Sequence, residues 1–249
     1  MIDTHTHYLD AAFDPDRETV LAGVADTIII EQGIDLASST KAVELARTHE
    51  NVYAAVGIHP VNAERELPHV GEIETLAGGQ RVAAIGEIGL DYRYGGRDVQ
   101  REVFISQLRT AKEYSLPVCI HCVRAWGDMM SILREHRPAG VMHGFSGSAE
   151  VLHEVLALGM YVGFNGSSTN PRNKKALAAI KEVPLDRLLL ETDCPYSVPK
   201  GAAAARCDSS LIAFTAEYIA ELKGISPQVI MDTSDENAYK LFDLKGERS

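Results

Sequence analysis

Short apolar runs alternate with amphipathic segments along most of the chain. The runs are rich in β-branched residues and are nearly continuous rather than alternating, which is typical of parallel strands that are covered on both faces. They predict strands at residues 2–5, 26–30, 52–56, 82–86, 117–121, 140–143, 160–164 and 187–191. The pattern therefore predicts a parallel sheet of eight strands.

Segments with apolar residues at helical spacing fill most of the gaps between these runs. Their spacing predicts helices at residues 39–50, 62–76, 99–114, 126–136, 149–158, 174–181, 208–223, 228–233 and 235–244. Ser148 and Ser226 stand where N-caps are expected, and Pro227 suits the first helical position. Pro68 interrupts the segment 62–76 and makes it the least regular of the set.

The succession of eight strand–helix units indicates the fold class. The chain has no internal repeat, low-complexity tract or linker that would divide it, and 249 residues suit one large α/β barrel. We therefore expect a single domain over residues 1–249, folded as a (β/α)8 TIM barrel. A doubly wound open sheet is the alternative that the same pattern allows.

Composition indicates in which compartment the protein is found and what its cysteines do. There is no run of about 18 apolar residues, which predicts no transmembrane helix, and the first residues lack the basic and apolar regions of a secretory signal. The four cysteines are Cys119, Cys122, Cys194 and Cys207. They are too few for a disulfide scaffold, and the C-x-x-C at 119–122 lies in a predicted strand, which favours packing over redox or zinc chemistry. We expect a cytoplasmic protein.

The formal net charge of −11 argues against a broad basic surface for nucleic acid. This charge is compatible with an enzyme whose bound cations neutralise the entrance of its active site, because metal ions can be the largest local charges there. Nothing in the sequence indicates an obligate protein partner.

The candidate chemistry lies where the predicted strands end. His5 and His7 are two residues apart, so an extended strand would direct both imidazoles to one face. Further polar residues follow the third, fourth, fifth, sixth and eighth strands, namely His59, Glu87, Asp91, His121, His143 and Asp193. In a barrel these strand ends meet at the face that carries the chemistry.

Each of these residues also has an ordinary structural interpretation. A histidine at a strand end is usually a hydrogen-bonded surface group, Asp193 before Cys-Pro could form a turn, and Glu87 between glycines could be a solvated loop residue. Four histidines and two carboxylates on one rim are less easily explained in this way. Imidazole and carboxylate suit an open, catalytic divalent-metal site, and the lack of cysteine there disfavours a closed structural zinc site.

In this order, the motifs resemble those of the metal-dependent amidohydrolase superfamily, and within it the TatD-type deoxyribonucleases. The similarity spans nearly the whole chain, and its markers are residues 3–7, 56–60, 86–92, 116–121, 143–147, 191–195 and 237–242. A glutamate after the fourth strand, in place of the carbamylated lysine of other branches, favours this branch.

The resemblance implies a centre of two divalent cations, which could be zinc, manganese, cobalt, nickel or magnesium. One cation would be held by His5, His7 and Asp193, and the other by His121 and His143, with Glu87 bridging them. The activity implied is the cleavage of phosphodiester bonds, mainly in DNA, at single strands or ends. Two such cations lower the pKa of a bridging water and polarise the phosphoryl oxygen.

Roles for the remaining residues follow from this chemistry. Asp193 is the expected general base, and Asp91 is expected to orient a ligand or a loop. His59 is a candidate contact for the phosphate or the leaving group, with a structural role in its Gly-x-His-Pro turn as the alternative. Arg124 and Arg93 are the expected basic contacts to substrate.

Two departures from the family pattern keep other substrates open. Val123 stands where an arginine is usual, and residues 206–210 stand where an Asn-x-Pro is usual. A two-metal hydrolase of a small phosphoester, lactone or amide is therefore the alternative function. A non-catalytic scaffold is a third possibility, against which the complete set of ligand residues argues.

Overall fold

Eight parallel strands follow one another around a barrel, in a computed structural model that describes residues 1–244. Each strand pairs in parallel with the next one in the chain. The strands are β1 (Ile2–Thr6), β2 (Ile28–Gln32), β3 (Val52–Val56), β4 (Val82–Asp91), β5 (Val118–Val123), β6 (Gly140–Met142), β7 (Tyr161–Phe164) and β8 (Leu188–Leu190). Residues 245–249 of the predicted domain lie outside the described part.

The barrel closes where β8 meets β1. The hydroxyl of Thr4 donates to the carbonyl of Leu190 at 3.0 Å. Beyond the end of β8, the backbone amide of Asp193 donates to the carbonyl of His5, and that of His7 donates to the carbonyl of Cys194, each at 2.9 Å. This closure confirms the predicted (β/α)8 TIM barrel, and the alternative of an open sheet is wrong.

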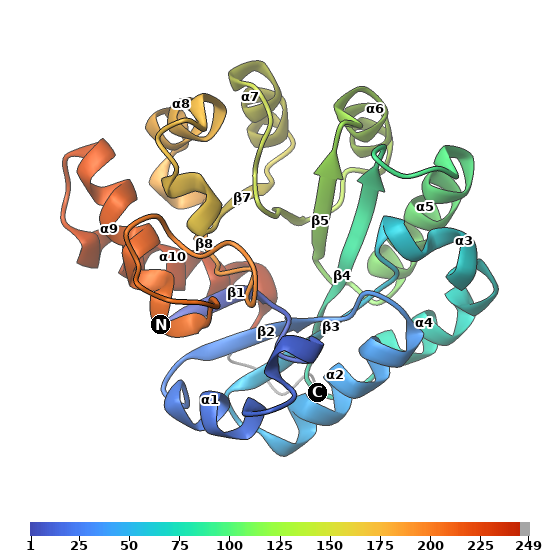
Figure 1. The fold of residues 1–249 in the computed structure, drawn as a ribbon. Coiled ribbons are helices and arrows are strands. Elements are labelled where there is room, and N and C mark those ends of the chain that lie inside the picture. Colours follow the sequence, from blue (N-terminus) through green and yellow to red (C-terminus); the bar gives the residue numbers. More distant parts are fainter. Residues whose placement is uncertain (245–249) are drawn as a thin grey trace.

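Helices surround the strands and follow one another around the barrel in chain order (Figure 1). They are α1 (Arg17–Gly23), α2 (Leu36–Thr48), α3 (Ala63–Glu66), α4 (Val70–Ala77), α5 (Arg97–Glu113), α6 (Trp126–His136), α7 (Ala149–Ala157), α8 (Lys174–Glu182), α9 (Ile212–Lys223) and α10 (Pro227–Phe242). Their apolar faces pack on the outside of the sheet and form most of the core. Within residues 1–244, no helix combines the length and the apolar character needed to cross a bilayer.

Several boundaries differ from the sequence-based prediction for identifiable reasons. Helix α1 was missed because only Leu21 on it is buried, so its apolar pattern is weak. The two helices predicted at 228–233 and 235–244 are the single helix α10. The residue between them, Ser234, is buried and its hydroxyl accepts a hydrogen bond from the Leu190 amide at 2.8 Å, so it faces the sheet and continues the helix.

Other predictions hold in detail. Ser148 caps α7 and Ser226 caps α10, which has Pro227 at its start. The segment 62–76 is broken around Pro68 into α3, a 3-10 turn and α4. All four cysteines are buried and unpaired, as expected of packing residues. Strand β4 is longer than predicted and reaches Asp91, so Glu87 lies inside a strand and not in a solvated loop.

Candidate metal centre

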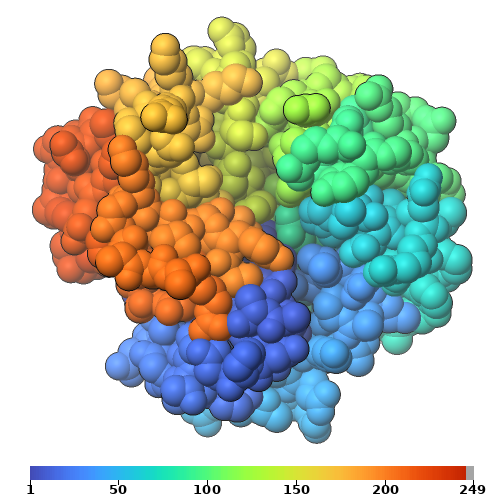
Figure 2. All heavy atoms as spheres, viewed as in Figure 1, coloured from blue at the N-terminus to red at the C-terminus, as the bar shows by residue number. Residues whose placement is uncertain are grey.

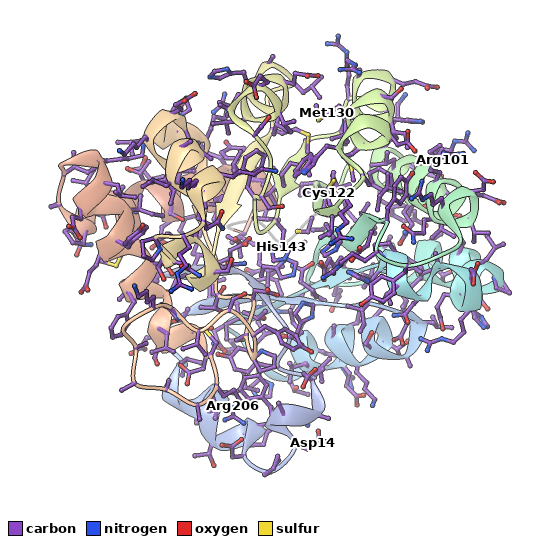
Figure 3. All side chains as sticks on the ribbon, turned by 45° about the horizontal axis from the view of Figure 1, so that its top comes forward. Asp14, Arg101, Cys122, Met130, His143 and Arg206 are labelled. Atoms are coloured by element: carbon purple, nitrogen blue, oxygen red, sulfur yellow. The ribbon has the colours of Figure 1, made fainter. Side chains whose placement is uncertain are left out.

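The carboxyl ends of the strands surround a cavity of about 580 Å³. The cavity appears as a depression near the middle of the face in Figure 2, and His143 lies near the centre of the ring of elements in Figure 3. Its lining includes most of the predicted site residues, namely His7, His59, Glu87, Arg93, His121, His143 and Asp193. The fold therefore gathers side chains from six strand ends in one place.

Local irregularities in two strands direct the ligand-type side chains into this cavity. The pairing register of β1 shifts between Asp3 and Thr6, and that of β4 shifts between Ile85 and Ile88. Such bulges are common beside active sites because they change the direction of a side chain. The second bulge contains Glu87, whose backbone amide donates to the carbonyl of Gly33 at 2.8 Å.

The two carboxylate oxygens of Glu87 face different groups of imidazoles. Oε2 lies 3.5 Å from Nε2 of His5 and 3.4 Å from Nε2 of His7. Oε1 lies 3.0 Å from Nδ1 of His121 and 3.9 Å from Nε2 of His143. A single carboxylate thus stands between two sets of nitrogen donors, which is the arrangement of a bridging ligand.

Asp193 and His59 complete the cluster. Oδ1 of Asp193 lies 3.7 Å from Nε2 of His7 and 3.9 Å from Nε2 of His143. Nε2 of His59 lies 3.6 Å from Oε1 of Glu87, and its Nδ1 accepts a hydrogen bond from the Val61 amide. His59 therefore has both a structural contact in its turn and a contact with the central carboxylate.

Two buried carboxylates stand behind the imidazoles. Oδ2 of Asp91 lies 3.1 Å from Nε2 of His121, on the side of the ring away from Glu87, and Asp91 also pairs with Arg93. Oε1 of Glu191 lies 2.9 Å from Nδ1 of His143. Carboxylates in this position fix the orientation of a histidine and make it a more basic ligand.

The charges of the cluster depend on one another. Burial alone would raise the pKa of Glu87, but His59, His5 and His121 hold it well below its ordinary value. Burial alone would lower the pKa of His143, but Glu191 and Asp193 raise it to about 10. Similarly, Glu87 and Asp193 raise the pKa of His7 to about 9 against the effect of burial. The neighbouring carboxylates therefore favour the protonated forms of His7 and His143.

The donor set fits a divalent cation. Nε2 of His5 and Nε2 of His7 are only 3.2 Å apart, and both nitrogens face Glu87. In the described part of the chain, three groups of potential ligand atoms each lie within 4.8 Å of one another, namely His5–His7–Glu87, His5–His143–Glu191 and His59–Glu87–His121. Nδ1 of His5 is buried without a hydrogen-bond partner. Imidazole and carboxylate in an open cavity suit zinc and similar transition metals.

The structure separates the two predicted basic contacts. Arg93 lines the cavity, whereas Arg124 is exposed and is not among the residues that line it. Sequence reasoning overlooked Glu191 and Glu31, and also Tyr94 and Tyr196 on the cavity wall. The position of Glu191, two residues before Asp193 at the same strand end, was the available signal.

Comparison with known proteins identifies relatives along almost the whole chain. The family model described as TatD related DNase matches residues 2–243. YabD of Bacillus subtilis, named an uncharacterized metal-dependent hydrolase, is 39% identical, with 97% of this chain and 98% of YabD covered. The 3'-5' ssDNA/RNA exonuclease TatD of Cronobacter sakazakii is 33% identical, with 97% of each chain covered. The crystal structure of YjjV, a TatD homologue from Escherichia coli, superposes with a TM-score of 0.88 at 31% identity and covers 98% of each chain.

Proposed function

The chain belongs to the family of TatD-related DNases, which makes it a metal-dependent hydrolase, and from that membership we propose that it cleaves phosphodiester bonds at the ends of single-stranded DNA. The observation that carries the proposal is the position of Glu87 between two sets of imidazole nitrogens. One cation would be held by His5, His7 and Asp193 and the other by His121 and His143, with Glu87 as the shared ligand. Two divalent cations so held would activate a water and polarise the phosphoryl oxygen.

The protein side chains supply the proton transfer. Asp193 is half-buried at the cavity wall, and its Oδ2 accepts a hydrogen bond from the Ser197 hydroxyl at 3.0 Å. This contact fixes one oxygen and leaves Oδ1 directed toward His7 and His143. In our proposal Oδ1 takes the proton of the attacking water, which is the role of a general base.

Other side chains position the reacting groups. Asp91 orients His121 through a hydrogen bond, and Glu191 orients His143 through the close charge contact at its Nδ1. Burial lowers the pKa of His59 to about 4, so this imidazole is neutral at physiological pH. A neutral His59 can donate one hydrogen bond to a phosphate oxygen or to the leaving oxygen.

The cavity wall supports nucleic acid as the substrate. Tyr94 and Tyr196 line the cavity with 49% and 55% of their surface exposed. Exposed aromatic rings beside a phosphodiester site are suited to stacking on unpaired bases, which contributes about 1–3 kcal/mol per base. Relatives named as ssDNA/RNA exonucleases agree with this assignment. RNA is therefore a second polynucleotide to be tested.

A small phosphoester remains the second candidate. Arg93 is the one lysine or arginine of the described chain that lines this cavity, and its charge is already paired with the buried Asp91. A cavity wall with so few free positive charges binds a single phosphate more readily than a long polyanion. The lactone and amide substrates have no comparable support.

The test is metal-dependent hydrolysis with several substrates in parallel. The protein would be stripped with EDTA and reloaded with zinc, manganese, cobalt, nickel or magnesium. A labelled single-stranded DNA oligonucleotide, the matching RNA, bis-p-nitrophenyl phosphate and a lactone panel would then be compared. We expect cleavage of the oligonucleotide that chelation abolishes. Turnover of the small phosphodiester alone would favour the second candidate, and turnover of lactones alone would contradict both.

A further inference from the structure

A second cavity of about 460 Å³ lies beside the metal-ligand cavity. It is formed between the loop after β7 and the loop after β8, gold and orange in Figure 1. The lining residues that carry polar side chains are Ser167, Asn170, Arg172, Ser197 and Lys200. None of these residues takes part in the proposed metal centre as a ligand.

The two loops are held together, so the cavity is a built feature of the fold. Gly166 approaches the second loop so closely that a Cβ atom would lie 1.9 Å from the carbonyl oxygen of Ser197. The backbone amide of Lys200 donates to the hydroxyl of Thr169 at 2.7 Å, and Thr169 is itself buried. These contacts fix the distance between the two walls.

The lining of the second cavity carries positive charge, although the molecule is acidic. The chain has a net charge of −11, yet the two charged residues that line this cavity, Arg172 and Lys200, are both basic. Arg172 and Lys200 are exposed, and neither forms an ion pair among residues 1–244. By contrast, Arg93 and Arg206 are paired with Asp91 and Asp16. The second cavity thus offers two uncompensated positive charges.

The second cavity is directly connected to the proposed catalytic groups. Ser197 lines the second cavity, and its hydroxyl donates to Oδ2 of Asp193, which lines the first. Tyr196, the preceding residue, lies on the wall of the first cavity. One short segment of chain therefore separates the two cavities, and an extended ligand could occupy both.

We propose that the second cavity is a binding subsite for a backbone phosphate of the substrate strand, held by Arg172 and Lys200 while the scissile phosphodiester lies at Glu87 and Asp193. This inference rests on the proposed function. A subsite of this kind explains how an acidic protein holds a polyanion, because the basic side chains lie where the strand leaves the metal centre. It also gives the strand an interaction that a small phosphodiester cannot make.

The test compares two doubly charge-reversed variants of the metal-loaded protein. R172E/K200E alters the second cavity. K41E/R109E is the matched control, since it exchanges one lysine and one arginine on α2 and α5, both exposed and without ion pairs among the described residues. The two variants have the same net charge, so they differ only in where the charge is placed.

Binding would be measured by fluorescence anisotropy of a labelled phosphorothioate oligothymidylate at several salt concentrations. We expect R172E/K200E to bind about tenfold more weakly at low salt, and its slope of log affinity against log salt to become shallower by about 0.7 for each phosphate that the variant no longer neutralises. The control should stay within about twofold of wild type, because Lys41 and Arg109 line neither of the two cavities. Turnover of bis-p-nitrophenyl phosphate should be unchanged in both variants. Matching thermal unfolding curves would confirm that both variants are folded.

An equal drop in oligonucleotide affinity in both variants would overturn the inference, as would no drop in either. If R172E/K200E keeps the wild-type affinity for the oligonucleotide but loses affinity for inorganic phosphate, the cavity takes free phosphate and its assignment to the strand is wrong. Failure of the proposed function would look different: wild type would hydrolyse neither substrate with any metal. The binding comparison would still decide the subsite in that case.

Discussion

Two clusters in this barrel bury a carboxylate at the ends of the strands, and their surroundings differ. Asp3 on β1 is fully buried, and Glu87 on β4 is 4% exposed. The carboxylate of Asp3 accepts hydrogen bonds from the Thr192 amide at 2.9 Å, the Thr192 hydroxyl at 2.6 Å and the Ser209 hydroxyl at 2.7 Å. The carboxylate of Glu87 faces imidazole nitrogens on both sides.

The difference lies in what each carboxylate requires. Hydroxyl and amide groups satisfy Asp3 without an ion, and these hydrogen bonds join β1 to the segment that follows β8, so this cluster closes the barrel. Imidazoles around Glu87 are ligands or acids, and they satisfy the carboxylate only when protons or cations lie between them. A buried carboxylate among donors is thus a structural feature, whereas a buried carboxylate among imidazoles is a candidate metal site.

The largest effect is expected for Asp193→Asn. The amide oxygen can still coordinate a cation, but the variant lacks the proton acceptor, whose contribution is typically about 10²–10⁴-fold in rate. Turnover of the oligonucleotide should fall by that factor, while calorimetry should show metal binding close to that of wild type. Turnover near the wild-type rate would place the general base at another residue.

A smaller effect on metal affinity is expected for Asp91→Asn. Asp91 orients His121, and removal of a carboxylate in such a position weakens metal binding by about 10–100-fold. The matched control is Asp128→Asn, because Asp128 also pairs with an arginine, Arg101, but does not contact an imidazole. Competition with a fluorescent chelator would measure both affinities. Equal metal affinities of the two variants would show that Asp91 does not contribute to metal binding.

The smallest effect concerns the pH dependence of stability in the cluster that closes the barrel. Burial raises the pKa of Asp3 from 3.8 to about 7, against the hydrogen bonds from Thr192 and Ser209. The folded state therefore holds this proton more tightly than the unfolded chain, and the stability that Asp3 contributes is greatest below pH 3.8 and is lost as the pH rises to about 7.

Asp3→Asn removes this titration. The free energy of unfolding of wild type, relative to the variant, should fall by at least about 1 kcal/mol between about pH 4 and pH 7. Urea denaturation of both proteins across this pH range is the measurement. A difference that stays constant with pH would mean that Asp3 does not change its charge in this range.

The sequence predicted the barrel well because most strands are nearly continuous apolar runs and six of the eight predicted strand ends carry a recognisable polar residue. It missed α1, whose single buried residue leaves no periodic pattern, and it divided α10 at Ser234, which is polar but faces the sheet. In both elements tertiary packing outweighs the local signal.

The candidate site was predicted less completely than the fold. His5, His7 and Glu87 stood out because their spacing and residue types suggest metal ligands. Glu191 and Asp3 did not, because their importance depends on partners far away in the chain, His143 for one and Ser209 for the other. Arg124 and Arg93 were both expected as basic contacts from their places in the sequence, and only Arg93 lies on the cavity wall. Long-range interactions of this kind leave no pattern in a single sequence.

The most direct test of the central claim is a calorimetric metal titration of wild type, Glu87→Gln and Asp3→Asn under the same conditions. If Glu87 is the shared ligand, wild type and Asp3→Asn should bind the same number of cations, namely two. Glu87→Gln should lose more metal affinity than Asp91→Asn, for which a reduction of about 10–100-fold is expected. Wild-type metal binding by Glu87→Gln would contradict the account, because the carboxylate that stands between the two sets of imidazoles would then not be a ligand.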